Sequence, residues 1–506
     1  MNKRKSLPPT LMCDFYKLSH REQYPKGTEY IYSTLVPRSL KYFPHGDEVV
    51  VFGVQYLVKR YIIDYFNNNF FNKNLEEVVE EYSRVLKYAL GDENPEVDHI
   101  KELHELGYMP IRIRALDEGQ VVKEKTPIMT IENTDKRFFW VTNFLETIIS
   151  AITWRAMTSA TISYEYRKVL DEYALKTVGN TDFVGIQGHD FSMRGQDSLE
   201  GAELSGMGHL LSFIGTDTVP AILAHENYYN TNIEEEVVGI GTRATEHSVM
   251  SANGDYTDLD EYETFKRLIT EVYPTGIVSI VSDTWDFWRN IRETLPKLKN
   301  EILNREGKVV IRPDSGDPVK ILCGDENSED ELVRKGLIEC LWDIFGGTYS
   351  DKGYKVLHES IGAIYGDSIT IERAKEICEK LEGKGFATTN VVLGIGSYTF
   401  MYNTTRDTLG FAIKATHSII EGEEKLLYKD PKTDDGTKKS HKGRVVVLED
   451  KEGNLVGIDG LTVEEQNSYD NDKLTEVYCN GKLTKDMTLK EIRKNVETSI
   501  NRVDLI

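Results

Sequence analysis

The chain has 506 residues and a mass of 57.7 kDa, a length that excludes a single small module or a disulfide miniprotein and predicts two or three domains with large cores. Apolar residues make up 40% and charged residues 28%, which are ordinary globular proportions and exclude an intrinsically disordered chain. The net charge of −22 repels nucleic acid and anionic membranes, so any anionic ligand must be bound by a local concentration of cations and backbone N–H groups.

The first third of the chain is predicted to form an α+β domain. Apolar residues recur at helical spacing over residues 48–71 and again over residues 138–175. Between these stretches, residues 109–122 and 127–134 alternate apolar and polar side chains, which predicts strands with one solvated face.

The middle of the chain has a different pattern, because short apolar runs now alternate with helical segments. Each run ends in a cluster of polar or charged residues, and the runs with their clusters cover residues 184–195, 213–218, 278–286, 308–318, 361–370, 390–397 and 411–418. Continuous apolar strands that alternate with helices indicate βαβ units, so we expect a β/α barrel or an open doubly wound sheet. In both folds ligands bind at the carboxyl ends of the strands, where these polar clusters fall.

The last eighty residues are more polar and contain a local inversion of charge. Residues 425–444 hold seven Lys or Arg and three Asp, which makes either an exposed loop or an anion site. Asn480-Gly481 predicts a tight hairpin turn. We therefore predict an α+β domain built from both chain ends, residues 1–180 with 418–506, and a barrel-like domain of residues 181–417.

Five cysteines are far apart and include no C-x-x-C pair, so we expect reduced thiols in a cytoplasmic protein. No run of 18 apolar residues occurs, and we expect neither a membrane partner nor a nucleic-acid partner.

The polar residues at the predicted strand ends are candidates for binding a phosphorylated sugar. Arginine binds phosphate bidentately, lysine supplies a mobile charge, and a glycine turn allows backbone N–H groups to approach phosphate oxygens. No P-loop occurs, and GIGSYT departs from G-x-G-x-x-G at its last position, so a kinase or a Rossmann dehydrogenase is disfavoured. The candidates are His189, Asp190, Arg194, Asp217, Glu246, His247, Asp283, Arg312, Asp314, Gly366, Asp367, Gly396, Ser397 and Lys414.

Several of these residues belong to motifs that occur in order over more than 450 positions. The motifs are DFYKLSHREQYP, ENTD, HDFSMRG, GTDTV, ATEHS, VSDTWD, IRPDSGDP, YGD, and YKDP followed by KKSHKGR. On these motifs the chain resembles the nicotinamide phosphoribosyltransferases, relatives of the nicotinate enzymes among the type II phosphoribosyltransferases. The resemblance implies an irregular β/α barrel with an additional α+β domain. It also implies transfer of a phosphoribosyl group from 5-phosphoribosyl-1-pyrophosphate to nicotinamide, which gives nicotinamide mononucleotide and pyrophosphate in NAD salvage.

The resemblance also implies roles for individual residues. Phe191 and a second subunit's Tyr16 would stack on the pyridine ring, so the enzyme would be a homodimer with active sites at the interface. Asp217 would accept the carboxamide N–H groups and repel a carboxylate, which favours nicotinamide over nicotinate. The remaining substrate-binding residues would be Arg194, Ser279, Arg312, Asp314, Gly366, Asp367, Gly396, Ser397 and Arg406, and the pyrophosphate would contact Arg38, Lys414, Lys429 and Lys438.

Two cofactors follow from the same resemblance. Mg²⁺ would be held mainly by the pyrophosphate, and ATP would phosphorylate His247. Asp283 would orient the other ring nitrogen of His247, with Glu246 adjacent. Three alternatives stay open: a nicotinate phosphoribosyltransferase, a catalytically inactive relative that acts as a binding protein, and a barrel aldolase that would use Lys414 as its Schiff-base lysine.

Overall fold

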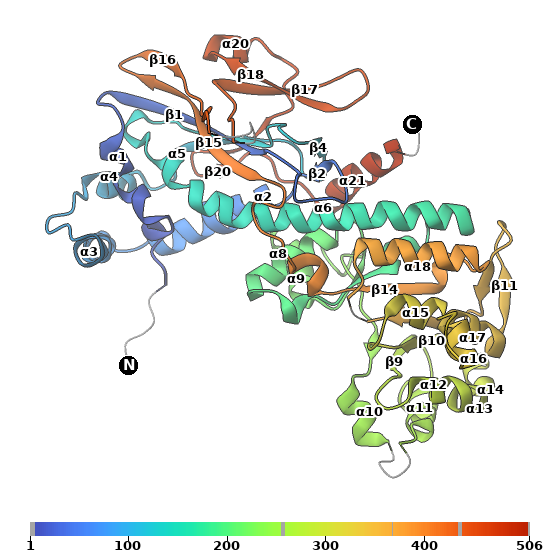
Figure 1. Cartoon of the computed structure of the whole chain (residues 1–506). Coiled ribbons are helices and arrows are strands. Elements are labelled where there is room, and N and C mark those ends of the chain that lie inside the picture. The colour runs from blue at the N-terminus through green and yellow to red at the C-terminus, as the bar shows by residue number, and fades with distance from the viewer. Residues whose placement is uncertain (1–5, 255–258, 367, 434–437, 504–506) are drawn as a thin grey trace. The chain divides into compact units, whose positions relative to one another are not determined.

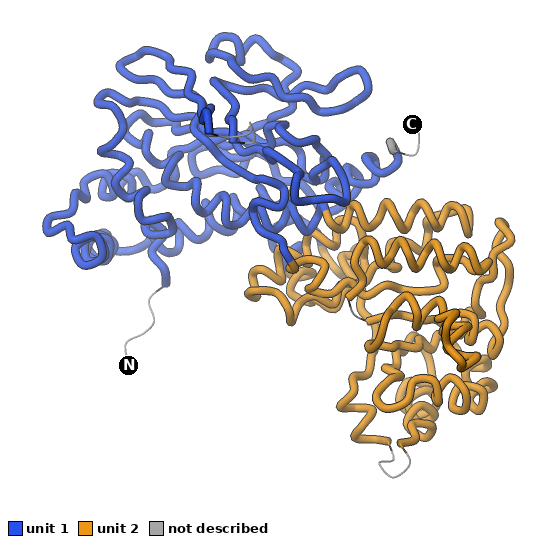
Figure 2. Tube along the Cα trace, viewed as in Figure 1, with its two compact units in different colours: residues 1–161, 224–231, 403–506 blue, residues 162–223, 232–402 orange. Residues whose placement is uncertain are grey.

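The computed structural model describes residues 6–254, 259–366, 368–433 and 438–503. The chain divides into two compact units, which Figure 2 shows in different colours. Unit 1 contains residues 1–161, 224–231 and 403–506, and unit 2 contains residues 162–223 and 232–402. Unit 1 therefore ends its first segment within α6 (Glu146–Thr177), before the predicted boundary at residue 180, and resumes at residue 403, before the predicted residue 418.

Unit 2 is built on a seven-stranded parallel sheet. The strands lie in the order β7-β6-β14-β13-β10-β9-β8, and every neighbouring pair is parallel. Ile240 also bridges in parallel to Gly215 of β7, only three residues before β8 begins, so the two edges of the sheet are linked and it curls into an irregular barrel. The strands are β6 (Gly188–Asp190), β7 (Gly215–Thr216), β8 (Arg243–Ala244), β9 (Val278–Val281), β10 (Val309–Arg312), β13 (Ile361–Tyr365) and β14 (Val391–Ile395).

Helices follow most of these strands, as the alternating pattern predicts. Polar caps fix where they begin: the Ser198, Asp317 and Thr370 side chains accept backbone N–H groups of the first turns of α8, α15 and α18. Figure 1 shows α10 to α18 gathered around β9, β10 and β14. The main helices of this unit are α8 (Leu199–His209), α10 (His247–Asn253), α11 (Tyr262–Arg267), α15 (Pro318–Cys323), α16 (Glu331–Lys335), α17 (Leu337–Phe345), α18 (Ile371–Gly383) and α19 (Ser397–Met401). The predicted α/β fold is thus confirmed.

Unit 1 contains a second seven-stranded sheet, in the order β16-β15-β1-β5-β3-β19-β20, and all of its pairs are antiparallel. Its strands are β1 (Thr28–Pro37), β3 (Ile111–Ala115), β5 (Met129–Asn133), β15 (Phe411–Ile420), β16 (Glu423–Leu426), β19 (Thr475–Cys479) and β20 (Lys482–Leu483). The predicted strands near residues 111 and 129 are confirmed. So is the tight turn, because Asn480 and Gly481 both have positive φ, as a type I′ turn requires.

Two predictions about elements are wrong. Residues 411–418 do not continue the parallel series, because β15 pairs antiparallel with β1 in unit 1. Residues 48–50 form the short strand β2 (Glu48–Val50) paired with β4 (Val121–Lys123), and the helical stretch begins only at Val54 and continues to Phe71.

The second helical prediction holds, because α5 (Val141–Phe144) and the 32-residue α6 occupy residues 141–177. A membrane-spanning helix, sufficiently long and apolar, was not found in the part of the chain that the structure describes.

Candidate active site

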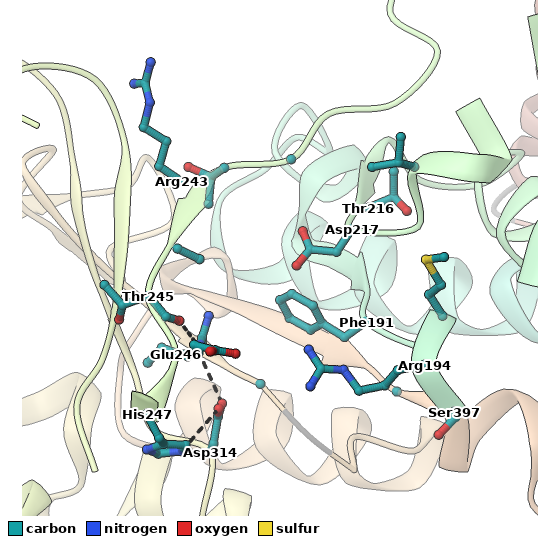
Figure 3. A pocket seen from close by; sticks show the side chains of 18 of the residues that line it. Phe191, Arg194, Thr216, Asp217, Arg243, Thr245, Glu246, His247, Asp314 and Ser397 are labelled. Carbon is teal, nitrogen blue, oxygen red and sulfur yellow. Dashed lines mark hydrogen bonds and ion pairs between the residues drawn. The ribbon is translucent and has the colours of Figure 1, made fainter. Parts of the chain in front are cut away.

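A cavity of about 1920 Å³ lies at the carboxyl ends of the parallel strands of unit 2 (Figure 3). Every strand except β9 contributes lining residues that directly follow or end it. Ten of the predicted site residues line this one cavity: Phe191, Arg194, Asp217, Glu246, His247, Arg312, Asp314, Gly366, Gly396 and Ser397. Residues spread over more than 200 positions are thus brought together, as the strand-end pattern predicts.

Phe191 and Asp217 form one wall of the cavity (Figure 3). Phe191 follows β6, and Asp217 follows the neighbouring strand β7, where its N–H donates to the Asp190 carbonyl at 2.9 Å. His189 links the two, because its Nε2 lies 2.9 Å from Asp217 Oδ1 and its ring centroid lies 4.6 Å from that of Phe191. This wall therefore offers an aromatic face beside a carboxylate acceptor.

Arg312 ends β10, and Asp314 follows that strand, on another wall of the cavity. Arg312 Nη2 donates to the Thr245 carbonyl at 2.5 Å, and Arg312 Nε lies 3.5 Å from Asp314 Oδ1. Thr245 is itself fixed on β9, since its hydroxyl accepts the Val281 N–H at 2.9 Å. The guanidinium is therefore held in one orientation before any anion binds.

His247 begins α10, and its side chain is 51% exposed at the cavity. Its Nε2 lies 3.9 Å from Asp283 Oδ1 and 3.9 Å from Asp314 Oδ2, and its Nδ1 lies 3.3 Å from the Thr284 hydroxyl. Both carboxylates therefore approach the same ring nitrogen and Thr284 approaches the other, and the role of Asp283 in orienting the ring stays a prediction.

Asp283 does not line the cavity but supports it. Its side chain is only 4% exposed, and its Oδ2 accepts the Asp314 N–H at 2.9 Å, the Ser315 N–H at 2.7 Å and the Ser315 hydroxyl at 2.5 Å. Three donors on one carboxylate oxygen fix the start of the loop that carries Asp314.

Glycines allow the closest approaches in the site. A Cβ on Gly366 would lie 1.9 Å from Asp314 Oδ1, and a Cβ on Gly195 would lie 2.0 Å from the Ser397 hydroxyl. Any side chain at either position would displace a lining residue. Ser397 also begins α19 and lines the cavity.

The other predicted residues are not among the described residues that line this cavity. Ser279 is buried within β9 and is not among the lining residues, and Asp367 lies outside the described residues. Unit 1 carries the remaining six: Tyr16, Arg38, Arg406, Lys414, Lys429 and Lys438. Lys414 lies on β15 of unit 1, and its Nζ is 2.6 Å from Glu146 Oε1. It therefore does not end a strand of the described barrel, where an aldolase would need its Schiff-base lysine.

The sequence did not single out Thr245, Thr284 or Ser315. Each follows or precedes a candidate residue by one position, and each acts through a hydroxyl or a backbone group. Small polar residues are common in turns, so only their position beside the candidates could have indicated them.

Within the described ranges, no group of three or more His, Cys, Asp or Glu residues is placed to hold a metal ion. Asp314, whose side chain is 29% exposed, is a cavity carboxylate beside Arg312, and carboxylate oxygens are ligands that Mg²⁺ takes.

Comparison with solved structures agrees with the barrel. The crystal structure of nicotinate-nucleotide pyrophosphorylase from Pyrococcus furiosus has a TM-score of 0.55 at 15% identity and covers 100% of both chains. The crystal structure of human nicotinic acid phosphoribosyltransferase also has a TM-score of 0.55, at 14% identity, and covers 97% of this chain and 94% of that one. At these identities the similarity concerns the fold.

Sequence comparison is more specific. Residues 186–482 match the nicotinate phosphoribosyltransferase (NAPRTase) family, and residues 10–113 match the nicotinamide phosphoribosyltransferase N-terminal domain. The nicotinamide phosphoribosyltransferase of Acinetobacter baylyi is 48% identical over 499 residues, covering 96% of this chain and 97% of that protein. That of Xanthomonas campestris is 33% identical, with 97% and 98% covered. The chain therefore belongs to the nicotinate phosphoribosyltransferase family, among its nicotinamide phosphoribosyltransferases.

Proposed function

We propose that this protein transfers the phosphoribosyl group of 5-phosphoribosyl-1-pyrophosphate to nicotinamide, giving nicotinamide mononucleotide and pyrophosphate. The observation that carries the proposal is one cavity that places the Phe191 ring and the Asp217 carboxylate together with two guanidinium groups, those of Arg194 and Arg312. An aromatic face and a hydrogen-bond acceptor suit a pyridine carboxamide, and guanidinium groups suit phosphates.

For this reaction the protein needs to bind and orient the two substrates and to stabilise the charge that develops. Phe191 would hold the pyridine ring flat, with its nitrogen toward the sugar, while Asp217 accepts the amide N–H groups. Arg312, fixed by Thr245 and Asp314, and Arg194 would bind phosphate oxygens and stabilise the charge that develops as the bond to pyrophosphate breaks. No protein nucleophile on the sugar is needed.

A competition assay tests the acceptor. Purified protein with phosphoribosyl pyrophosphate and Mg²⁺ should form mononucleotide faster from nicotinamide than from nicotinate, and Asp217→Ala should lower that preference by about 10- to 100-fold. A wild-type preference for nicotinate would instead support the closest alternative, a nicotinate phosphoribosyltransferase. An absence of product from both acceptors would support a catalytically inactive binding protein. The sequence argues against that alternative, because it retains all five of the predicted site residues Arg194, Asp217, His247, Arg312 and Asp314.

We further propose a homodimer with active sites at the interface. Apolar side chains at the cavity are unusually exposed, Leu199 by 72% and Val219 by 60%, and a second copy would cover them. Tyr16 is also exposed and available to a partner.

Complementation tests the shared site. Tyr16→Ala and Asp217→Ala should each be poorly active, and mixing the two after reversible dissociation should restore about a quarter of wild-type activity, because each mixed dimer contains one intact site. No recovery in confirmed mixed dimers would contradict a site built from both subunits.

ATP coupling through His247 and a requirement for Mg²⁺ are part of the proposal. The exposed ring of His247 in the cavity supports the first, and the half-buried Asp314 carboxylate in the same cavity, beside Arg312, supports the second. Incubation with γ-labelled ATP should label the wild type and not His247→Ala, and chelation by EDTA should abolish mononucleotide formation. Equal labelling of both proteins would reject the phosphohistidine.

A cytoplasmic location is also proposed. Cys13, Cys323, Cys340, Cys378 and Cys479 are all unpaired, which supports a reducing compartment. Cell fractionation followed by immunoblotting tests it, and recovery in a periplasmic or secreted fraction would contradict it.

A further inference from the structure

We propose that His189 is a positioning residue that determines acceptor specificity, because it holds the Asp217 carboxylate in the orientation that selects an amide over an acid. This inference rests on the proposed function and concerns the same site. His189 lies on β6, one residue before the strand ends, and its side chain is buried, whereas Asp217 is 46% exposed at the cavity. The imidazole therefore lies behind the carboxylate, on its protein side.

The contact orients both oxygens of Asp217. His189 Nε2 lies 2.9 Å from Oδ1, and a carboxylate oxygen can only accept, so the imidazole donates. With Oδ1 used in this way, Oδ2 is the oxygen left to face a ligand in the cavity. A half-exposed aspartate without this bond would rotate about its side-chain torsions and lose that alignment.

The imidazole is itself held in place. His189 pairs with Gly215 across β6 and β7, and a Cβ on Gly215 would lie 2.8 Å from His189 Nδ1, so the glycine provides the room for the ring. The ring also lies against Phe191 at a centroid distance of 4.6 Å and an interplanar angle of 39°. One side chain thus contacts both the predicted ring-binding residue and the predicted amide acceptor.

The consequence is selection between acceptors. An N–H donor behind Asp217 keeps its outward oxygen an acceptor, which the amide of nicotinamide satisfies and the carboxylate of nicotinate repels. Because the bond would be made equally in the ground and transition states, its loss should raise the KM for nicotinamide and leave kcat nearly unchanged.

Three variants and a double-mutant cycle test the proposal by steady-state kinetics with nicotinamide and nicotinate. His189→Leu should lower kcat/KM for nicotinamide by about 10- to 100-fold, chiefly through KM, and lower the preference over nicotinate by a similar factor. His189→Gln, which can present an amide N–H near the Nε2 position, should stay within about threefold of the wild type. Gly215→Ala, which keeps the imidazole but displaces it, should resemble His189→Leu.

The cycle with Asp217→Ala is decisive. In that background His189→Leu should change the preference by less than about twofold, because the residue through which it acts is gone. His209→Gln is the matched control: His209 is a second buried imidazole, bonded to the Gly215 carbonyl at 2.9 Å, and its substitution should leave the preference unchanged. An undiminished effect of His189→Leu in the Asp217→Ala background, an equal effect of His209→Gln, or an unchanged preference in soluble His189→Leu would each overturn the inference. A wild type that does not prefer nicotinamide would instead refute the proposed function.

Discussion

Asp283 is expected to be the residue whose loss most disturbs the site, although it does not line the cavity. Its Oδ2 accepts three hydrogen bonds, of 2.9 and 2.7 Å from the N–H groups of Asp314 and Ser315 and of 2.5 Å from the Ser315 hydroxyl. Each hydrogen bond to a charged acceptor contributes about 1.5–3 kcal/mol, but in the variant water can replace part of the hydrogen bonding of the exposed Ser315. Asp283→Ala should therefore lower the free energy of opening this loop by about 3–5 kcal/mol. Ser315→Ala removes one bond and should cost about 1–2 kcal/mol.

Hydrogen exchange measured by mass spectrometry reports the stability of the loop around residues 314–316 itself, whether or not the two units unfold together. A loss of about 2 kcal/mol raises the exchange rate about 30-fold, so peptides that contain residues 314–316 should exchange at least that much faster in Asp283→Ala. The kcat/KM for phosphoribosyl pyrophosphate should fall in parallel, because Asp314 is misplaced.

The neighbouring carboxylate is a matched control. Asp286 caps α12 (Phe287–Arg289) through a 2.9 Å bond from the Arg289 N–H, and Asp286→Ala should cost about 1 kcal/mol without changing exchange at residues 314–316. Unchanged exchange at residues 314–316 in Asp283→Ala, or an effect of Ser315→Ala as large as that of Asp283→Ala, would contradict this role of Asp283.

Three further changes have defined outcomes. Glu132→Gln should destabilise unit 1 by about 3–5 kcal/mol in thermal melts while leaving the acceptor preference intact, because it breaks the buried 2.9 Å ion pair with Arg444. Burial lowers the pKa of His209 from 6.5 to about 4, so between these pH values the unfolded chain binds more protons than the folded chain, and the free energy of unfolding falls on acidification. Between pH 6.5 and pH 4 the wild type should lose on the order of 3 kcal/mol more of this free energy than His209→Gln, as measured by urea titration. Gly366→Ala should push Asp314 aside and lower kcat/KM by about 100-fold with an unchanged circular dichroism spectrum, and a drop below threefold would contradict the close approach.

The barrel and its site were predictable from sequence for a physical reason. A strand buried on both faces must be a continuous apolar run, and the polar residues that follow it must lie at one end of the sheet. Arg312 ends β10, Asp314 follows it and Asp217 follows β7, and all three line the cavity, as this pattern predicts.

The errors have an equally physical cause. The pattern of residues 411–418 describes a strand but not its partner, and β1, which binds it, lies more than 370 residues earlier in the chain. The supporting hydroxyls of Thr245 and Thr284 have no periodicity at all, since each contributes one hydrogen bond to a neighbour that only the fold brings close. The pattern of apolar and polar residues predicts the helices, the strands and the strand ends. The residues that support the site from behind depend on tertiary contacts, which this pattern does not predict.

The acidic composition is compatible with the anion binding that we propose for the cavity, because the two act at different ranges. The net charge of −22 is spread over the whole chain, and in physiological salt the field of exposed charges is screened beyond about 8–10 Å. Two carboxylates of the cavity are already engaged, since Asp217 accepts from His189 and Asp314 lies beside Arg312, and behind the cavity Asp283 accepts backbone N–H groups. Carboxylates used in this way orient the groups that are predicted to bind the substrate, because each holds a donor or a cation in place. The local field in the cavity therefore depends on where the guanidinium groups of Arg312 and Arg194 lie, and the composition of the chain does not determine their positions.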